Sequence, residues 1–162
     1  MMRLRLCGVL AVLLALGLAA PAQNKDQKHA KEEQQLADLI NAARAKDKLP
    51  AVKVDPLLIK VAREHAANMA KQKKLETELD QKSTTDRLTA AGYKWATSSE
   101  HISKNRDLNQ LDQVVAGWLK GVFGKMQILS DKYDEIGVGI VPASADPKDG
   151  YYISAVFAKK SP

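Results

Sequence analysis

Apolar residues recur every three or four positions in the first half of the chain, which is the spacing of amphipathic helices. One helix is predicted from Leu36, and it ends before Pro50 because proline disfavours helical backbone in the residue that precedes it. A second helix is predicted from Asp55, whose side chain can cap the first turn while Pro56 takes the first helical position. The apolar face of this second helix includes His65.

Further along, the pattern predicts a short helix, an irregular stretch and a long helix. Residues 83–92 begin with N-cap residues and end in glycine, so they are expected to form the short helix. Residues 93–102 are mixed and polar, which indicates a loop or a short strand. The helical period returns most clearly from Leu108, with Trp118 expected as a central core anchor. Two glycines, the first of them Gly121, weaken the end of this helix.

Two strands are predicted at the end of the chain. Residues 135–141 alternate glycine with β-branched residues, and residues 150–157 are rich in aromatic and β-branched side chains. The segment between them, residues 146–150, is dense in turn formers, so the two strands should pair as an antiparallel hairpin. Helices followed by a hairpin predict an α+β fold rather than an alternating α/β fold.

The first 22 residues have the three-part pattern of a secretory signal peptide. A short basic start is followed by the uncharged stretch 6–20 and by small residues suited to cleavage after Ala22. The apolar stretch is shorter than the roughly 20 residues that a spanning helix needs. We therefore predict a signal peptide over residues 1–22, a polar tether over 23–35 and one domain over 36–160, with no membrane-spanning segment after cleavage.

Charge and cysteine content narrow the functional classes. The chain has 25 Lys and Arg against 19 Asp and Glu, and removing the leader with Arg3 and Arg5 leaves 23 against 19, a net charge of +4. This charge suits an anionic envelope component but is too small to indicate nucleic acid. The single cysteine, Cys7, lies in the leader, so the mature chain has no disulfide, no thiol nucleophile and no cysteine-bound metal.

Few residues are candidates for chemistry. The common nucleophile, zinc-protease and phosphate-binding motifs are missing. His65 is interpreted as a core histidine with one satisfied ring nitrogen, because a lone ligand cannot hold a metal. Glu100 and His101 pair a carboxylate with an imidazole, but neighbours on a strand point to opposite faces. Glu135 is either a strand-end charge or a second cleft carboxylate that reaches toward Glu100.

Several of these segments, taken in order, resemble the CAP superfamily, whose secreted domains include cysteine-rich secretory proteins, insect venom antigens and plant pathogenesis-related proteins. Ser99-Glu100-His101-Ile102 stands where the family has Gly-Glu-Asn-Ile. The other segments that carry the resemblance are residues 39–50, 54–70, 86–93, 118–129 and 135–139. The likeness is greatest to disulfide-free bacterial members and implies an α-β-α sandwich, with a small antiparallel sheet between helical layers and a binding cleft.

The chain departs from the family in that cleft. The family's cleft often holds two histidines and acidic residues that can bind a divalent metal, and the resemblance places the first histidine near Thr77, within residues 75–80, and the second at Gly124. Neither residue is a histidine, so we expect no metal and no cofactor. The acidic positions are kept, since Glu100 matches the motif glutamate and Glu135 the hairpin glutamate. His101 replaces the motif asparagine and is the remaining candidate ligand.

The expected function is therefore that of a non-catalytic binding or interaction module, secreted or held in the periplasm or cell envelope. Its partner would be an envelope lipid, glycan or protein and not a nucleic acid. One alternative is a hydrolase that uses Glu100 and His101, with Glu135 as a third candidate member. Another is a lipid or sterol carrier, which needs an apolar groove of roughly 300 Å3 or more.

Overall fold

The computed structural model describes residues 28–162. The predicted signal peptide, residues 1–22, and the start of the predicted tether lie outside the described residues. The longer elements follow in the order α1 (Ala30–Lys46), β1 (Lys53–Val54), α2 (Pro56–Gln72), α3 (Thr84–Ala90), β2 (Trp95–Asn105), α4 (Leu111–Lys120), α5 (Val122–Ile128), β3 (Glu135–Pro142) and β4 (Tyr151–Lys160). Short 3-10 helices lie at Leu108–Gln110 and Pro147–Asp149.

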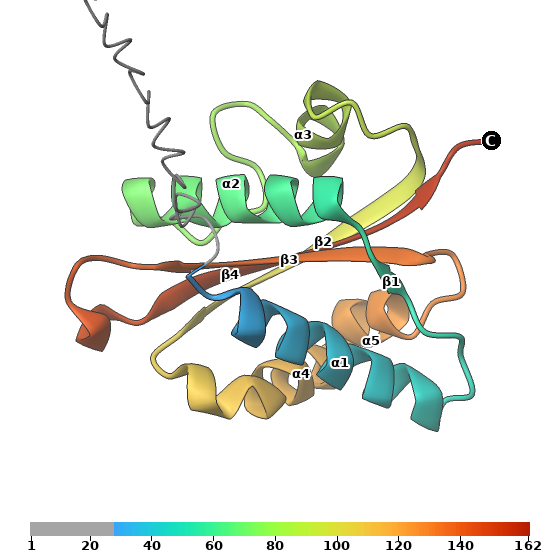
Figure 1. The fold of residues 1–162 in the computed structure, drawn as a ribbon, viewed down its shortest axis with the longest axis horizontal. Helices are drawn as coiled ribbons and strands as arrows, with labels where there is room; N and C mark the ends of the chain where they lie inside the picture. The colour runs from blue at the N-terminus through green and yellow to red at the C-terminus, as the bar shows by residue number, and fades with distance from the viewer. Residues whose placement is uncertain (1–27) are drawn as a thin grey trace, which may run out of the picture.

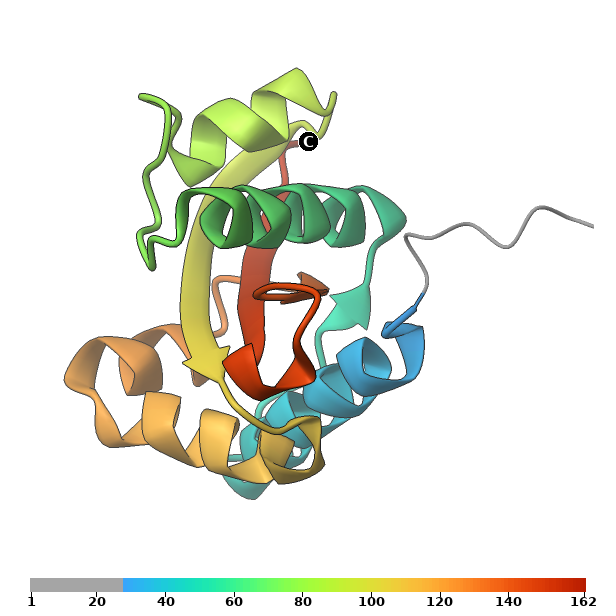
Figure 2. The same cartoon turned by 90° about the vertical axis from the view of Figure 1, so that its left-hand side faces the viewer.

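The strands form one sheet in the order β1-β3-β4-β2, with helices on both faces. Helices α2 and α3 cover one face, and α1, α4 and α5 lie on the other (Figure 1, Figure 2). This arrangement is the three-layer α-β-α sandwich that the family resemblance implied. The last strand in the chain, β4, lies between β3 and β2 and is antiparallel to both.

The expected small antiparallel sheet is present as β3, β4 and β2, and the short strand β1 adds a parallel pair at its edge. Lys53 and Val54 of β1 pair in parallel with Glu135 and Ile136 of β3. The chain leaves α1 on one face of the sheet and enters α2 on the other, and it passes the edge of β3 on the way (Figure 1). Two residues are too few to show the alternation of apolar and polar positions that predicts a strand.

The hydrophobic core has a larger part between the sheet and helices α1 and α4, and smaller parts under α2 and α3. Fully buried members of the larger part are Leu36, Ile40, Leu111, Ile128, Ile136, Ile153, Ala155 and Phe157. The part under α2 and α3 contains Leu58, Val61, Ala62, Leu88, Tyr93, Val156 and Ala158. These clusters lie within residues 36–158, so the described part of the chain carries a core of its own.

The glycines of β3 allow α2 to pack directly on the sheet. A Cβ atom at Gly137 would lie 2.0 Å from the carbonyl carbon of Leu58, and one at Gly139 would lie 2.2 Å from the backbone nitrogen of Arg63. Since these contacts are with backbone, no side-chain movement could relieve them. The glycine alternation of this strand is thus a track for the helix above it.

Most predicted boundaries are confirmed where the sequence carries a cap. The Asp55 carboxylate accepts hydrogen bonds from the backbone nitrogens of Leu57 and Leu58, as expected for the start of α2. Ser83 and Asp86 form a capping box at the start of α3. The predicted hairpin is present as β3 and β4.

Several predictions about single elements were wrong. Helix α1 begins at Ala30 rather than Leu36, so residues 30–35 of the predicted tether are helical. The stretch predicted as a loop or short strand is the 11-residue strand β2. The long helix predicted from Leu108 is divided, because Gly121 has extended backbone (φ −77°, ψ 138°) between α4 and α5. Trp118 is only partly buried against the core, so it is no central anchor.

None of the described helices is long and apolar enough to cross a lipid bilayer.

Candidate functional site

Glu100 of β2 lies at the centre of a buried polar group that we call the Glu100 cluster: His65, Thr84, Arg87, Glu100 and Ser154. The side chain of Glu100 is 1% exposed. One carboxylate oxygen accepts a hydrogen bond from the Ser154 hydroxyl at 2.6 Å. The other accepts from the Thr84 hydroxyl at 2.7 Å and from the Arg87 guanidinium. The carboxylate is therefore compensated by a cation and hydrogen-bonded on both oxygens, as a buried charge must be.

His65 of α2 belongs to the same cluster. Its Nε2 lies 2.9 Å from the carbonyl oxygen of Glu76 and 4.0 Å from the nearer Glu100 oxygen. Because a carbonyl can only accept, Nε2 carries the proton, and Nδ1 has no partner within the described residues. Burial lowers the pKa of His65, so the ring is neutral at pH 7. The prediction of a core histidine with one satisfied ring nitrogen is confirmed.

Arg87 of α3 connects this cluster to the loop between α2 and α3. Its guanidinium donates to the carbonyl oxygens of Thr77 and Lys82, at 3.0 and 2.8 Å, as well as to Glu100. One side chain thus holds the loop, the helix and strand β2 together. The buried Glu100 carboxylate therefore has a structural role, which is to hold Arg87 in this position.

His101 does not share a site with Glu100, so the geometry required for the hydrolase alternative is absent. As expected for neighbours on a strand, His101 faces the other side of the sheet. Its ring stacks on Trp118, with centroids 5.5 Å apart, and meets Phe157 edge-on at 6.1 Å. Burial lowers the pKa of His101 as well. The imidazole that comes near Glu100 is that of His65, on a different element.

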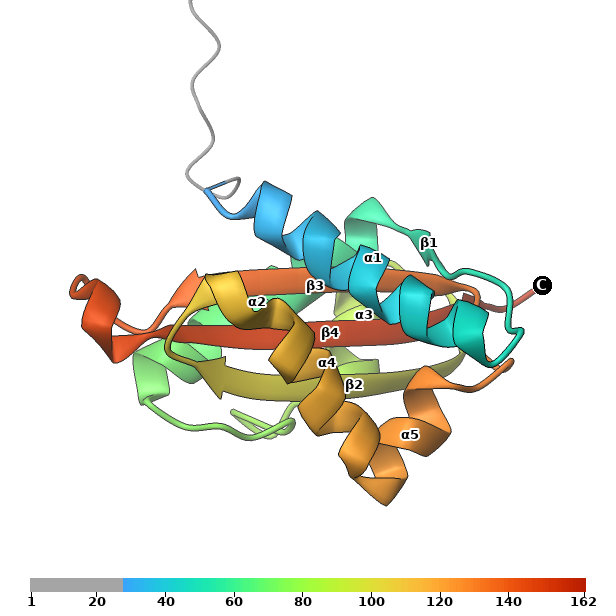
Figure 3. The ribbon, with the colours of Figure 1, turned by 90° about the horizontal axis from the view of Figure 1, so that it is seen from below.

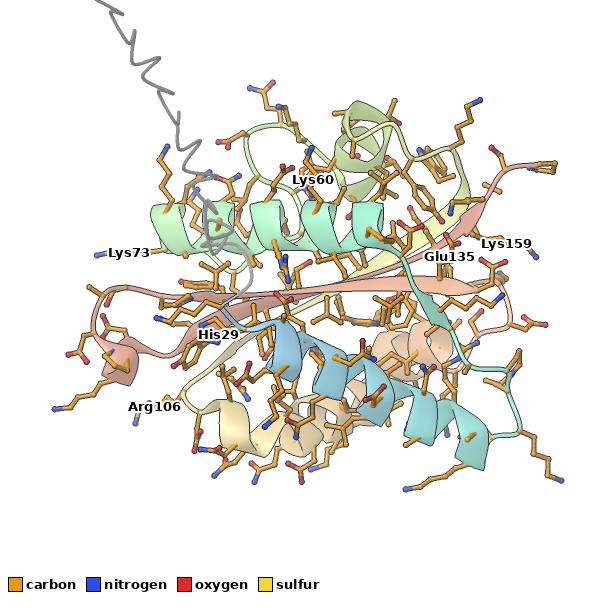
Figure 4. All side chains as sticks on the ribbon, viewed as in Figure 1. His29, Lys60, Lys73, Arg106, Glu135 and Lys159 are labelled. Carbon is orange, nitrogen blue, oxygen red and sulfur yellow. The ribbon has the colours of Figure 1, made fainter. Side chains whose placement is uncertain are left out.

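Glu135 is the first residue of β3, and its side chain binds neighbouring residues there and does not reach toward Glu100. Its carboxylate accepts from the Tyr93 hydroxyl at 2.6 Å and from the Lys160 ammonium at 2.9 Å. The same ammonium donates to Asp55 at 2.9 Å. Burial of the ring and the hydrogen bond to Glu135 raise the pKa of Tyr93. Figure 4 shows Glu135 near the C-terminal end of β4, and its role there is that of a strand-end ion pair.

The two places at which the family resemblance expects histidines have different surroundings. Gly124 is buried, and a Cβ atom there would lie 2.0 Å from the carbonyl oxygen of Trp118. No side chain fits at this position unless the backbone moves. Thr77 lies in the exposed loop that Arg87 holds. Within residues 28–162, no three His, Cys, Asp or Glu side chains come together in a group that could hold a metal ion.

A groove of about 600 Å3 lies at the β3 edge of the sheet, which is the edge opposite β2 and Glu100, and we call it the α1–α2 groove. It runs between the start of α1, helix α2 and the end of β3, where β1 no longer covers the strand. Its apolar lining comes from Ile59, Ile140, Val141 and Pro142, and its charged lining from Lys28, Lys60, Arg63 and Glu64. Figure 4 shows His29, another lining residue, at the start of α1.

Arg63, which lines this groove, takes part in a buried ion pair. Glu33 of α1 is 5% exposed and accepts from the Arg63 guanidinium of α2. The same carboxylate accepts from the backbone nitrogen of Ile140 at 3.1 Å, which satisfies a donor at the edge of β3. Helices on the two faces of the sheet are thus joined around its edge.

Sequence analysis identified Glu100 but missed its partners and the groove. Arg87 and Ser154 lie 13 and 54 positions from Glu100, so no local spacing connects them. The groove is built from three elements whose apolar residues look like ordinary core residues in the sequence. One signal in the sequence was Glu33, which precedes Leu36, the first apolar residue of the predicted helix, by a single turn. Its position indicated that the helix could start earlier and bring a carboxylate to the edge of the sheet.

Comparison with known proteins identifies relatives of this fold. YkwD of Bacillus subtilis is 28% identical over 118 residues, which are 70% of this chain and 44% of that protein. An outer surface protein of Borrelia burgdorferi has a similar structure, with a TM-score of 0.74 at 21% identity over 82% of this chain and 96% of that one. An extracellular SCP-domain protein of Bacillus anthracis gives 0.68 at 24% identity, over 81% of this chain and 41% of that one.

This chain thus spans less than half the length of YkwD and of the Bacillus anthracis protein. The likenesses in structure concern the fold alone. The model of the cysteine-rich secretory protein family matches residues 37–157, which include nearly all of the sheet and most of both helical layers. The chain belongs to the cysteine-rich secretory protein family, CAP.

Proposed function

We propose that this protein is an exported, non-catalytic binding module of the cell envelope. Its ligand occupies the α1–α2 groove and has an anionic group and an apolar part, as an envelope fatty acid or lipid has. The observation that carries this proposal is the lining of the groove, which places Lys28, Lys60 and Arg63 beside Ile59 and Ile140. Its volume of about 600 Å3 is in the ordinary range for small-molecule sites.

The charges of the groove favour an anionic ligand. Three cationic side chains line it against one carboxylate, that of Glu64, while Glu33 behind the lining compensates Arg63. The Lys60 ammonium and the Glu64 carboxylate are 3.9 Å apart and mostly exposed, so their pairing is weak and an incoming anion can replace it. Lys28 then supplies the excess positive charge.

The Glu100 cluster supports a binding role rather than a catalytic one. A general base needs a free acceptor within reach of its substrate, whereas the Glu100 oxygens accept from three side chains in a site closed to solvent. The imidazole proton of His65 is already donated to Glu76. The proposal includes no metal and no cofactor.

Export and envelope location belong to the same proposal. The signal-peptide pattern of residues 1–22 supports them. So do the similar proteins from Borrelia burgdorferi and Bacillus anthracis, which are described as an outer surface protein and an extracellular protein.

Calorimetric titration with dodecanoate below its micellar concentration tests the groove. The Lys60→Glu variant should weaken binding by about tenfold, which corresponds to roughly 1.4 kcal/mol. Lys46→Glu makes the same charge change at an exposed position on α1 outside the groove lining, and it should leave binding unchanged. Equal losses of affinity in both variants would show that the net charge of the protein, and not the groove, determines binding. Absence of binding to the wild-type chain would refute the groove as the ligand site.

A further inference from the structure

Helix α5 presents the most exposed large apolar side chains among the described residues. Phe123 is 78% exposed, Val122 72% and Met126 68%, whereas other exposed large apolar residues range from 37% to 47%. Together with Lys120 and Lys125 they form what we call the α5 tip. Figure 3 shows α5 at the margin of the helical layer, beyond the end of α4.

The backbone holds the α5 tip outward. Gly121 has extended backbone, so α5 departs from the direction of α4. Gly124 packs directly against the backbone of Trp118, which leaves no space for α5 to turn its outer face inward. Ile128, on the inner face of α5, is fully buried in the core. The helix is therefore anchored on one side while its apolar outer side remains in solvent.

The charges around the tip indicate what covers it. No acidic residue occurs between Asp112 and Asp131, and the charges in that interval are Lys120 and Lys125. Both lysines are exposed; they flank Val122 and Phe123 in the sequence, and Met126 follows Lys125 directly. Protein interfaces are depleted in lysine, whereas apolar side chains flanked by lysines are typical of segments that lie in the surface of anionic bilayers.

We propose that the α5 tip is a membrane-contact site for an anionic phospholipid surface. Val122, Phe123 and Met126 enter the interfacial layer, and Lys120 and Lys125 pair with lipid phosphates. Three side chains and two charges give weak, reversible association rather than permanent anchoring, because stable attachment needs a larger apolar group or a second signal. This surface is formed by α5 and the last residue of α4, Lys120, and it shares no residue with the lining of the α1–α2 groove.

Co-sedimentation with phospholipid vesicles tests the proposal on residues 23–162, which include the complete described core. The wild-type chain should bind vesicles containing about 30% phosphatidylglycerol and should bind pure phosphatidylcholine vesicles at least about tenfold more weakly. The double variant Phe123→Ser/Met126→Ser should lower the partition coefficient at least about tenfold. Lys120→Gln/Lys125→Gln should reduce binding and flatten its dependence on salt.

Leu75→Ser is the matched control, because Leu75 is also exposed and follows Lys73 and Lys74 on the other side of the sheet. It should bind vesicles as the wild type does, and all variants should keep the wild-type melting temperature because the altered side chains lie in solvent. An equal loss in Leu75→Ser, or no binding to anionic vesicles, overturns the proposal. Light scattering that shows a wild-type dimer and a monomeric Phe123→Ser/Met126→Ser variant also overturns it, since the tip would then contact a second copy.

Discussion

At the scale of single residues, the buried charges of this protein are explained by their partners. The family resemblance assigned Glu100 to the cleft, whereas in the structure its carboxylate holds α3 and the neighbouring loop through Arg87. The sequence indicated that Glu100 was special but not why, because an acid that binds a ligand and an acid that binds an arginine look alike in a chain. Gly124 is the opposite case, since its contact with the Trp118 backbone leaves no space for a side chain at that position.

Replacing Glu100 with alanine should lower the free energy of unfolding by about 3–5 kcal/mol. The reason is that Arg87, whose side chain is 11% exposed, would keep its charge without a partner carboxylate. Urea unfolding measures the loss. The double variant Glu100→Ala/Arg87→Met should be more stable than the two single losses predict, because the unpaired cation is gone. A loss below about 1 kcal/mol in Glu100→Ala would contradict the structural role of the cluster.

At the scale of elements, the sequence predicted what local signals specify. Helices α2 and α3 were predicted because Asp55 and Ser83 cap them, and the hairpin because turn formers separate two β-branched runs. The length of β2 was missed, because it is a polar edge strand whose register depends on β4, some 50 residues later. The early start of α1 was missed because Glu33, in its first turn, is held by residues of distant elements. These partners are the Arg63 guanidinium and the backbone nitrogen of Ile140.

Glycine-to-alanine variants test how closely α2 packs on β3. Gly139→Ala should destabilise the protein by at least about 1–3 kcal/mol, because its Cβ would lie 2.2 Å from backbone that cannot move aside. Gly117→Ala is the matched control inside α4, with nothing within 4 Å of its Cβ, and it should stabilise the protein by about 0.5–1 kcal/mol. Urea unfolding should give opposite signs, and equal signs would contradict the glycine track.

At the scale of the whole molecule, the two faces of the sheet have different chemistry. The face toward α2 and α3 carries the Glu100 cluster and the ion pairs of Glu135, whereas the face toward α1 and α4 carries most of the apolar core. The α+β class could be predicted from the order of elements. The layers followed from the family resemblance, but the groove at the sheet edge arises only where three distant elements meet.

Stability should fall with acid below about pH 6.5, the ordinary pKa of histidine. Burial lowers the pKa values of His29, His65 and His101 in the folded state, so the unfolded chain binds more protons as the pH falls below that value. The stabilisation is present at pH values above about 6.5 and is lost progressively as the pH falls below it, with a slope of at most about 1.4 kcal/mol per pH unit for each histidine. Urea unfolding at about pH 7.5, 6 and 5 measures this.

His101→Phe should reduce this acid sensitivity, because a phenyl ring keeps the contacts with Trp118 and Phe157 without binding a proton. An unchanged pH dependence in this variant would show that His101 is not among the groups responsible.

The central place of β4 has a consequence for how the chain can be made. The ten-residue strand β4 lies between β3 and β2 in the sheet but follows both in the sequence. A chain that ends before β4 therefore lacks the strand that joins β3 to β2. A nascent or prematurely terminated chain would offer two open strand edges, and such edges favour aggregation. The native sheet therefore cannot form until β4 has been synthesised, because β3 and β2 do not pair with each other directly.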